Sequence, residues 1–409
     1  MKTIIEYMTL ALIFFNLFSV SAQHATPETN PLMSGYHTPN MYSTGTQIER
    51  ITQAIQDAQG STGRVIIPAY DVVSRSKTWL IDRAILLPSN IELVLDNCTI
   101  KLSDQCRDNF IRSANAGLGI TDIKPLHHIR IRGMGNAVLE GADNPRSTGD
   151  HNKTLSTDPN GNYKLSYGSD AGKTGENQKG GWRNHGIILA HVDHFQISGV
   201  TLKNYHAHGI VLERAQQGKI MDITFDVRQA VNVNGHDKQV LNQDGLGVRF
   251  GCKNIIIDNC RGKSGDDFIN IGLTDTQVSA GQENVNVVSG SIYRGKSDDI
   301  ANIYLQNWQD FYSLSHRAIR IMPVGKLRIS NIFIDNMIIP PRSRQGLVAE
   351  YAENIQGLFV RNLVTHHPII SKGIRYASFR NILYHGQGKA IDVVPTDSVQ
   401  IEHVLNVPE

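Results

Sequence analysis

The feature that most constrains the fold is a repeat of short strands. Runs of alternating apolar and polar residues, rich in Ile and Val, recur along the chain, and most end at an Asn or Gly corner. The steps between them are roughly 20 to 35 residues, a period typical of stacked structural units. Helical patterns are too few for helix pairs, so the sequence predicts an all-β fold, a right-handed parallel β-helix. The runs begin at His128, His194, Lys219, Asn254, Asn284, Leu327, Ile355, Ala377 and Ser398.

One amphipathic helix is expected before the first strands. In "TGTQIERITQAIQDAQG" the apolar residues from Ile48 to Ala58 recur on one helical face, with Thr46 as the N-cap and Gly60 as the stop. The first coil of a β-helix presents unpaired backbone that needs a cover. We therefore expect this helix to cap the N-terminal end of the stack.

The N-terminus reads as a targeting segment. An apolar run from Met8 to Val20, too short to cross a bilayer, ends in "SVSAQ", a small-residue cleavage pattern that places the cut after Ala22. We expect a signal peptide over residues 1–22 and a single β-helix domain over residues 23–409, secreted or periplasmic. The segment 142–184 breaks the repeat with Gly, Asn, Ser and Thr, and is expected to be a long loop that overhangs the cleft.

Composition excludes several classes of partner. The net charge is +2, and no Lys/Arg run stands out, so neither nucleic acid nor an acidic membrane is expected to bind. No later apolar stretch is long enough for a membrane span, and we expect a monomer. The four cysteines, Cys98/Cys106 and Cys252/Cys260, lack zinc-site spacing. Two local disulfides and four buried thiols both remain open.

Two similar segments each carry a pair of carboxylates. "RGKSGDDFINIG" holds Asp266 and Asp267, and "RGKSDDIANIY" holds Asp298 and Asp299. Asp is common at β-helix corners, so a catalytic pair needs further carboxylates at the matching position of a neighbouring coil. Asp244 in "LNQDGLGV" lies about one coil before the first pair, whereas no similar motif precedes the second. The first pair is therefore expected to be catalytic, and the second to be a corner or rim feature.

These motifs resemble those of glycoside hydrolase family 28, the pectin-degrading polygalacturonases with a pectin-lyase-like β-helix. "NQDG" resembles the Asn-Thr-Asp-Gly block of that family, "GDD" its Gly-Asp-Asp block, and "RIM" followed by "NIFIDN" its Arg-Ile-Lys block. The resemblance implies an inverting glycoside hydrolase without metal or cofactor. Asp266 would be the general acid, Asp244 and Asp267 would activate the water, and Asn242 would orient the cluster.

The sequence departs from the family pattern at two places. No histidine follows the Asp pair where the family has Gly-His-Gly, and Met322 replaces the Lys of Arg-Ile-Lys. These losses leave hydrolysis of a plant or algal polysaccharide, pectin-like or otherwise acidic, as the expected activity, with unsubstituted polygalacturonate as a poor substrate. The remaining candidates for substrate binding are Arg320, Arg317, His316 and His208, with His206 nearby in sequence.

Two other functions stay open. A β-helix polysaccharide lyase would abstract a proton beside a uronate carboxylate with calcium or an Arg/Lys pair. A β-helix that only binds glycan would release no reducing ends. The one-coil spacing of Asp244 and Asp266 argues against a protein that only binds glycan, whereas absorbance from a new double bond in the product would identify a lyase.

Overall fold

The computed structural model describes residues 35–104, 106, 108–116, 124–143, 185–228, 230–233, 236–239, 243–272, 295–323 and 325–407. The chain divides into two compact units, Met1–Gly35 and Tyr36–Glu409, and every helix and strand described belongs to the second. The expected signal peptide and nearly all of the segment 142–184 lie outside the described residues. Across the described residues, no helix combines the length and apolar character that a membrane crossing requires.

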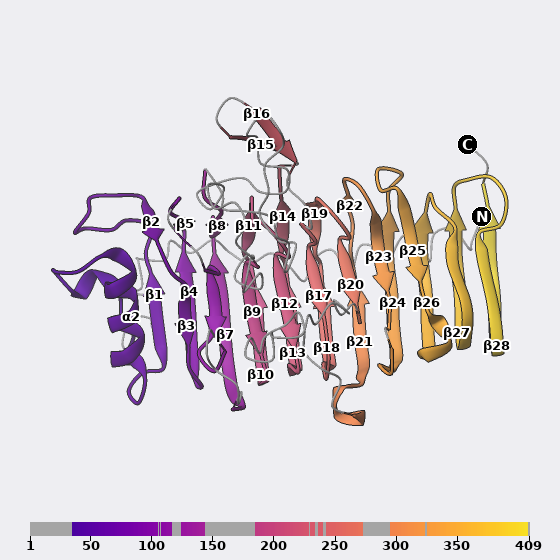
Figure 1. Ribbon diagram of the computed structural model, residues 1–409, viewed down its shortest axis with the longest axis horizontal. Coiled ribbons are helices and arrows are strands. Elements are labelled where there is room, and N and C mark those ends of the chain that lie inside the picture. Colours follow the sequence, from indigo (N-terminus) through magenta and orange to yellow (C-terminus); the bar gives the residue numbers. More distant parts are fainter. Residues whose placement is uncertain are drawn as a thin grey trace, which may run out of the picture. The chain divides into compact units, whose positions relative to one another are not determined.

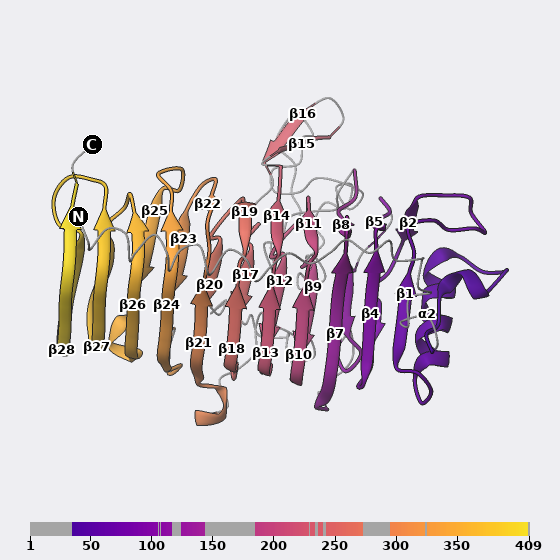
Figure 2. The same cartoon turned by 180° about the vertical axis from the view of Figure 1, so that it is seen from behind.

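The second unit is a right-handed parallel β-helix, as the repeat predicts. Its coils follow one another in chain order (Figures 1 and 2), and the strands lie on three faces. Face 1 is formed by β3 (Ile85–Leu87), β6 (Ile111–Ser113), β9 (Ile187–Ala190), β12 (Ile210–Glu213), β17 (Leu246–Val248), β20 (Ile269–Ile271), β23 (Arg317–Ile321), β25 (Gln345–Ala349) and the starts of β27 (Ile369–Tyr384) and β28 (Ile391–Asn406).

Faces 2 and 3 complete each coil. Face 2 is formed by β1 (Arg64–Ile67), β4 (Ile91–Asp96), β7 (Leu126–Met134), β10 (Val192–Ser198), β13 (Gln216–Met221), β18 (Lys253–Asp258), β21 (Ile300–Gln306), β24 (Ile329–Ile339), β26 (Ile355–Thr365) and the second halves of β27 and β28. Face 3 is formed by β2 (Thr78–Ile81), β5 (Thr99–Leu102), β8 (Val138–Glu140), β11 (Thr201–Lys203), β14 (Thr224–Asp226), β19 (Arg261–Ser264) and β22 (Phe311–Ser313).

The core is made of aligned apolar side chains inside the coils. Strand register places the same inward position of successive face 2 strands side by side, and these residues are buried. Because the side-chain period of a strand is two, the outward positions between them form equally regular rows on the surface. One such inward row runs Ile131, Ile197, Ile220, Ile257, Leu305, Ile334, Val360 and Phe379.

Corners and ends of the stack follow the sequence signals. Many corner asparagines adopt a positive φ and bond one another between coils; Asn302 Nδ2 donates to Asn254 Oδ1 at 2.8 Å. Helix α2 (Gln47–Ala58) begins at a capping box between Thr46 and Glu49. It contacts β1, β2 and β3 at the N-terminal end of the stack (Figure 1), which confirms the expected cap.

Several smaller features interrupt or connect the coils. The four cysteines are buried thiols rather than two disulfides, which answers the question that the sequence left open. A two-stranded antiparallel sheet, β15 (Ala230–Val233) with β16 (His236–Gln239), is inserted between β14 and β17. The 3-10 helices within the described ranges are η2 (Pro39–Met41), η4 (Lys296–Asp298) and η5 (Ala352–Asn354).

Candidate active site

The N-terminal edge of face 1 brings carboxylates of neighbouring coils together. The register of β17 and β20 pairs Leu246 with Ile269, so the residues two positions earlier, Asp244 and Asp267, stand beside each other. The backbone amide of Gly245 donates to the carbonyl of Asp267 at 3.0 Å and holds this alignment. Asp267, rather than Asp266, is thus the residue one coil from Asp244, a refinement of the spacing expected from sequence.

Gly245 allows the two coils to approach. A Cβ at this position would lie 2.4 Å from the carbonyl oxygen of Phe268, closer than real Cβ atoms come. The Asp-Gly pair is therefore required by close packing immediately behind Asp244.

The second and third carboxylates lie in a bend between faces 3 and 1. Strand β19 ends at Ser264 and β20 begins at Ile269, so Asp266 and Asp267 are not in extended strand and need not point to opposite faces. The hydroxyl of Ser264 donates to the carbonyl of Asp266 at 2.7 Å, and the amide of Asp267 donates to Asp266 Oδ1 at 2.8 Å. The amides of Gly265 and Asp266 both donate to the carbonyl of Gln243 in the preceding coil.

Asp244 is almost fully buried, with 3% of its surface exposed. Its Oδ2 accepts a hydrogen bond from the amide of Asn270 and lies 3.4 Å from His208 Nδ1. The other ring nitrogen of His208 lies 2.7 Å from Nη2 of Arg249. Asn270 occupies the outward position of β20 beside Gly247 of β17, where the missing side chain leaves room for the amide.

Asp267 is also buried, at 1% exposure, but it faces two guanidinium groups. Its Oδ2 lies 3.3 Å from Arg320 Nη1, and its Oδ1 lies 3.6 Å from Arg317 Nη1. The backbone amide of Arg317 also donates to Oδ1, at 3.2 Å. Both arginines come from β23, one coil after Asp267.

Burial and mutual repulsion set the electrostatics of this pair. Burial raises the pKa of Asp244 well above its ordinary value, and the charges of Asp266 and Asp267 raise it further. The pKa of Asp267 is also raised, first by burial and then by Asp266, while Arg320 and Arg317 act in the opposite direction. Of these two buried carboxyl groups, Asp244 keeps a proton more readily, and Asp267 is the one that the arginines favour as an anion.

Asp266 is the accessible member of the group. Its side chain is 23% exposed, and its Oδ1 lies 3.1 Å from Nδ1 of His316. The hydroxyl of Ser315 lies 2.7 Å from the same nitrogen and donates to the carbonyl of Gly265 at 2.5 Å. The turn that carries Asp266 is thus bonded to the turn that carries His316 in the next coil.

A further carboxylate, Glu350, lies behind the two arginines. Its Oε1 accepts from Arg317 Nη2 at 2.9 Å, and its Oε2 accepts from Arg320 Nε at 2.8 Å. The remaining terminal nitrogen of Arg320 lies 3.0 Å from the sulfur of Met322. Two guanidinium groups are therefore matched by two carboxylates, Asp267 and Glu350.

The structure brings together most of the residues predicted from sequence. Asp244, Asp266, Asp267, Arg317, Arg320, His316 and His208 form one connected group. Asn242 and residues 283–291, which correspond to the Gly-His-Gly block of the family, lie outside the described residues. His206 is buried as well. The sequence analysis did not predict Asn270, Arg249, Ser315 or Glu350. Asn270 could have been found, because it lies one coil before Arg320 and pairs with it in the strand register.

The second Asp pair has a different environment. Asp298 is buried in η4, and its two oxygens accept from Nε and Nη2 of Arg214, each at 2.9 Å. Asp299 Oδ1 accepts from the backbone amide of Arg328 at 3.1 Å. These contacts fit a structural corner, although Asp298 is more deeply buried than a solvated rim residue.

No set of three or more His, Cys, Asp or Glu side chains in the described part of the chain is arranged to hold a metal ion.

Comparisons with known proteins support the resemblance. The family described as glycosyl hydrolases family 28 matches residues 129–351, more than half of the chain. No curated protein sequence matches the chain. Among solved structures, the family 28 exopolygalacturonase of Yersinia enterocolitica has 14% identity and a TM-score of 0.52, with 90% of this chain and 76% of that chain covered.

Two other solved structures are less similar. The polygalacturonase of Erwinia carotovora has 13% identity and a TM-score of 0.46, with 95% of this chain and 99% of that chain covered. The endo-xylogalacturonan hydrolase of Aspergillus tubingensis has 13% identity and a TM-score of 0.43, with coverage of 91% and 93%. At 14% identity the exopolygalacturonase structure shows the fold alone, and the family match carries the assignment. The chain belongs to glycosyl hydrolases family 28 and is a glycoside hydrolase with a polysaccharide substrate.

Proposed function

We propose that the protein hydrolyses a glycosidic bond by an inverting acid/base mechanism with Asp266 as the general acid. The observation that carries this assignment is the contrast between one accessible carboxyl group and two buried ones. Asp266 is the only member of the three with substantial exposure. It is therefore the group that a leaving oxygen can reach, with His316 and Ser315 holding its orientation.

The buried pair activates the water in this scheme. A base must be ionised, and three neighbouring carboxyl groups resist full ionisation. Arg317 and Arg320 favour the anion of Asp267, while Asp244 holds a proton more readily. Asp267 therefore accepts the proton of the water, and Asp244 helps to position that water. Asn270 and His208 fix the carboxyl group of Asp244, and Asn242 serves the same cluster.

We infer that the sugar beside Arg320 is not a free uronate. Asp267 and Glu350 already match the charges of Arg317 and Arg320, and the thioether of Met322 stands where the family has a lysine. A substrate carboxylate at this position would lie beside arginines whose charges are already neutralised, and Glu350 would repel it. The substrate is thus a pectin-like plant or algal polysaccharide whose sugar at this subsite is neutral or substituted.

Secretion completes the proposal. Residues 1–22 act as a signal peptide, and residues 23–409 form the mature single domain, which works as a monomer in the periplasm or the medium. The support is the sequence of the N-terminus and the polymeric nature of the substrate, which cannot enter a cell.

The deciding experiment compares four matched substitutions on a panel of pectic, rhamnogalacturonan and sulfated algal glycans, read by release of reducing ends. Asp266→Asn and Asp244→Asn should lower kcat by at least roughly 10²-fold to 10⁴-fold, since each removes a proton-transfer or water-holding group at constant shape. Asp299→Asn should leave kcat unchanged. Asp298→Asn should lower the melting temperature instead, because it leaves the half-buried guanidinium group of Arg214 beside a neutral amide.

Other outcomes would overturn the assignment. Equal loss of activity in the folded Asp299 variant would make the second pair functional. New absorbance from a double bond in the product would show a lyase. Retention of the anomeric configuration, followed by NMR of the first product, would exclude the inverting mechanism.

A further inference from the structure

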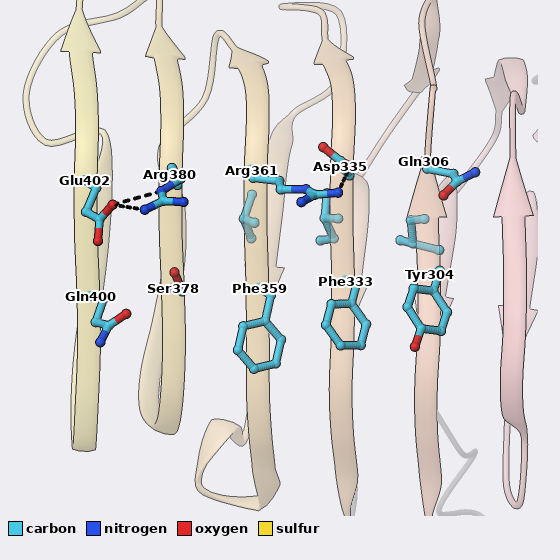
Figure 3. A pocket seen from close by; sticks show the side chains of 13 residues that line it. Tyr304, Gln306, Phe333, Asp335, Phe359, Arg361, Ser378, Arg380, Gln400 and Glu402 are labelled. Carbon is cyan, nitrogen blue, oxygen red and sulfur yellow. Dashed lines mark hydrogen bonds and ion pairs between the residues drawn. The ribbon is translucent and has the colours of Figure 1, made fainter.

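A groove of about 510 Å³ lies on face 2, away from the carboxylates of face 1. Its floor is formed by the outward positions of β21, β24, β26, β27 and β28. Register aligns these positions in two parallel rows (Figure 3). The aromatic row is Tyr304, Phe333, Phe359, Ser378 and Gln400, and the polar row is Gln306, Asp335, Arg361, Arg380 and Glu402.

The aromatic row offers an apolar surface to solvent. The rings of Tyr304 and Phe333 are stacked with centroids 4.6 Å apart, and those of Phe333 and Phe359 with centroids 5.0 Å apart. Offset stacking at the strand spacing leaves part of each ring face uncovered. Tyr304 is 36% exposed, and Phe333 and Phe359 are half-buried. Exposed aromatic groups gathered in one hollow mark a binding surface more often than a purely structural one.

The polar row gives this surface hydrogen-bonding capacity without net charge. Arg361 pairs with Asp335 at 2.6 Å, and Arg380 pairs with Glu402 at 2.6 Å. The two guanidinium groups and two carboxylates cancel, so the groove attracts neither a polyanion nor a polycation. Their planar donors and acceptors, together with Gln306, are directed along one edge of the ring surface (Figure 3).

We propose that this groove is a second, non-catalytic binding site for an uncharged stretch of polysaccharide. A pyranose ring has an apolar C–H face and an edge of hydroxyl groups, which match the aromatic row and the polar row. The charge balance of the groove matches a neutral polyol. The proposal goes beyond the catalytic assignment and requires no particular role for Asp266, because it concerns binding to the other face of the same coils.

The site would hold the enzyme on a long substrate. A polymer bound at the groove keeps other parts of the same chain, or of the same cell-wall particle, at high local concentration near face 1. Substrates too short to reach both faces would gain nothing. The groove should therefore affect binding to long glycan and leave turnover of short fragments unchanged.

The test separates binding from hydrolysis. Asp266→Asn protein is run by affinity electrophoresis in gels that contain pectic galactan, arabinan or, as an anionic comparison, homogalacturonan. At least one neutral glycan should retard it. Adding Phe333→Ala or Tyr304→Ala should weaken the retardation by roughly tenfold in Kd, equivalent to about 1.4 kcal/mol. Arg361→Ala, an exposed change in the polar row, should also weaken it.

Matched controls decide the interpretation. Tyr376→Ala removes an exposed aromatic side chain of β27 that does not line the groove, and should bind like the parent. Circular dichroism and melting temperatures establish that the variants are folded. When the groove substitutions are made in protein that keeps Asp266, kcat on a short oligosaccharide should equal that of the wild type.

Three results would overturn the proposal. No retardation by either neutral glycan would do so, as would unchanged retardation in the folded aromatic and Arg361 variants. If sedimentation instead shows a dimer that the groove substitutions dissociate, the groove is an interface between two copies of the chain. None of these results bears on whether Asp266 is the general acid, which the kcat measurements decide separately.

Discussion

Removing the charge of Glu350 should convert the site to one that accepts uronates. Glu350→Gln keeps the shape of the side chain and one acceptor oxygen, but it removes the anion that both Arg317 and Arg320 contact. Asp267 then matches only one of the two guanidinium groups. The variant should therefore present one uncompensated positive charge at the proposed sugar subsite.

The magnitude follows from the geometry. Two unit charges about 4 Å apart interact by about 4 kcal/mol at an effective dielectric constant of 20. The side chain of Glu350 is 29% exposed, so solvent screening reduces this value. We expect about 1.4 kcal/mol for a galacturonate carboxylate, which is a tenfold effect on binding. The Michaelis constant for polygalacturonate fragments should fall by that factor, and the gain should shrink at high salt.

Two comparisons make the experiment decisive. Glu353→Gln changes the net charge equally at an exposed position in η5, and should leave the Michaelis constant unchanged. A neutral substrate should show no gain in the Glu350 variant. If the folded Glu350 variant binds uronates no better than the wild type, Glu350 is not what limits acceptance of uronates, and the inference of a neutral subsite is wrong.

Two further predictions concern stability and export. Asp244→Asn should raise the melting temperature at neutral pH, because the pKa of Asp244 is raised in the folded state and its ionisation therefore opposes folding. The stability that the protonated carboxyl group contributes is present below its unfolded-state pKa and is lost as the pH rises through its folded-state pKa. A carboxyl group whose pKa is one unit higher in the folded state loses about 1.36 kcal/mol of stability when it ionises, so the advantage of the variant should vanish on acidification. Thermal melts that show the same advantage at every pH would contradict this cause. For export, mass spectrometry of native protein should find an N-terminus at Gln23, and an intact Met1 would refute the signal peptide.

The coil architecture could be predicted because its signals are local. Alternation of apolar and polar residues defines each strand, and asparagine corners with positive φ define where it ends. The capping helix could be predicted for the same reason, since Thr46 and Glu49 form a capping box within one turn. Each of these signals needs only a few consecutive residues.

The contacts between coils could not be predicted as well, because they depend on the length of every turn. The hairpin of β15 and β16 is inserted before Asp244, so the coil that ends there is longer than its neighbours. Glu350 contacts Arg320 across a coil boundary that no motif marks. Asp298 pairs with Arg214, which lies 84 residues away. Sequence spacing gave the approximate coil of each residue but not its partner.

The repeated "RGKS" segments illustrate the same limit. Residues Arg261–Ser264 form strand β19, and the turn after them carries Asp266 and Asp267. In the later copy, Lys296–Asp298 form the 3-10 helix η4. Two segments of similar sequence thus adopt different secondary structure in their coils. The first pair was separated from the second by the presence of Asp244, a non-local argument, rather than by anything within the segments themselves.

The energetics of the carboxylates also distinguish the two kinds of aspartate in this fold. A corner aspartate such as Asp335 accepts hydrogen bonds from Asn362 and Arg361 near the surface, where it stabilises the turn at little desolvation cost. Asp244 and Asp267 are instead buried side by side, and each has a raised pKa, so their charged forms oppose folding. The hydrogen bonds between coils do not require two buried carboxyl groups at this position. Acid/base catalysis does require closely spaced carboxyl groups of unequal proton affinity, and the burial of this pair therefore argues for catalysis.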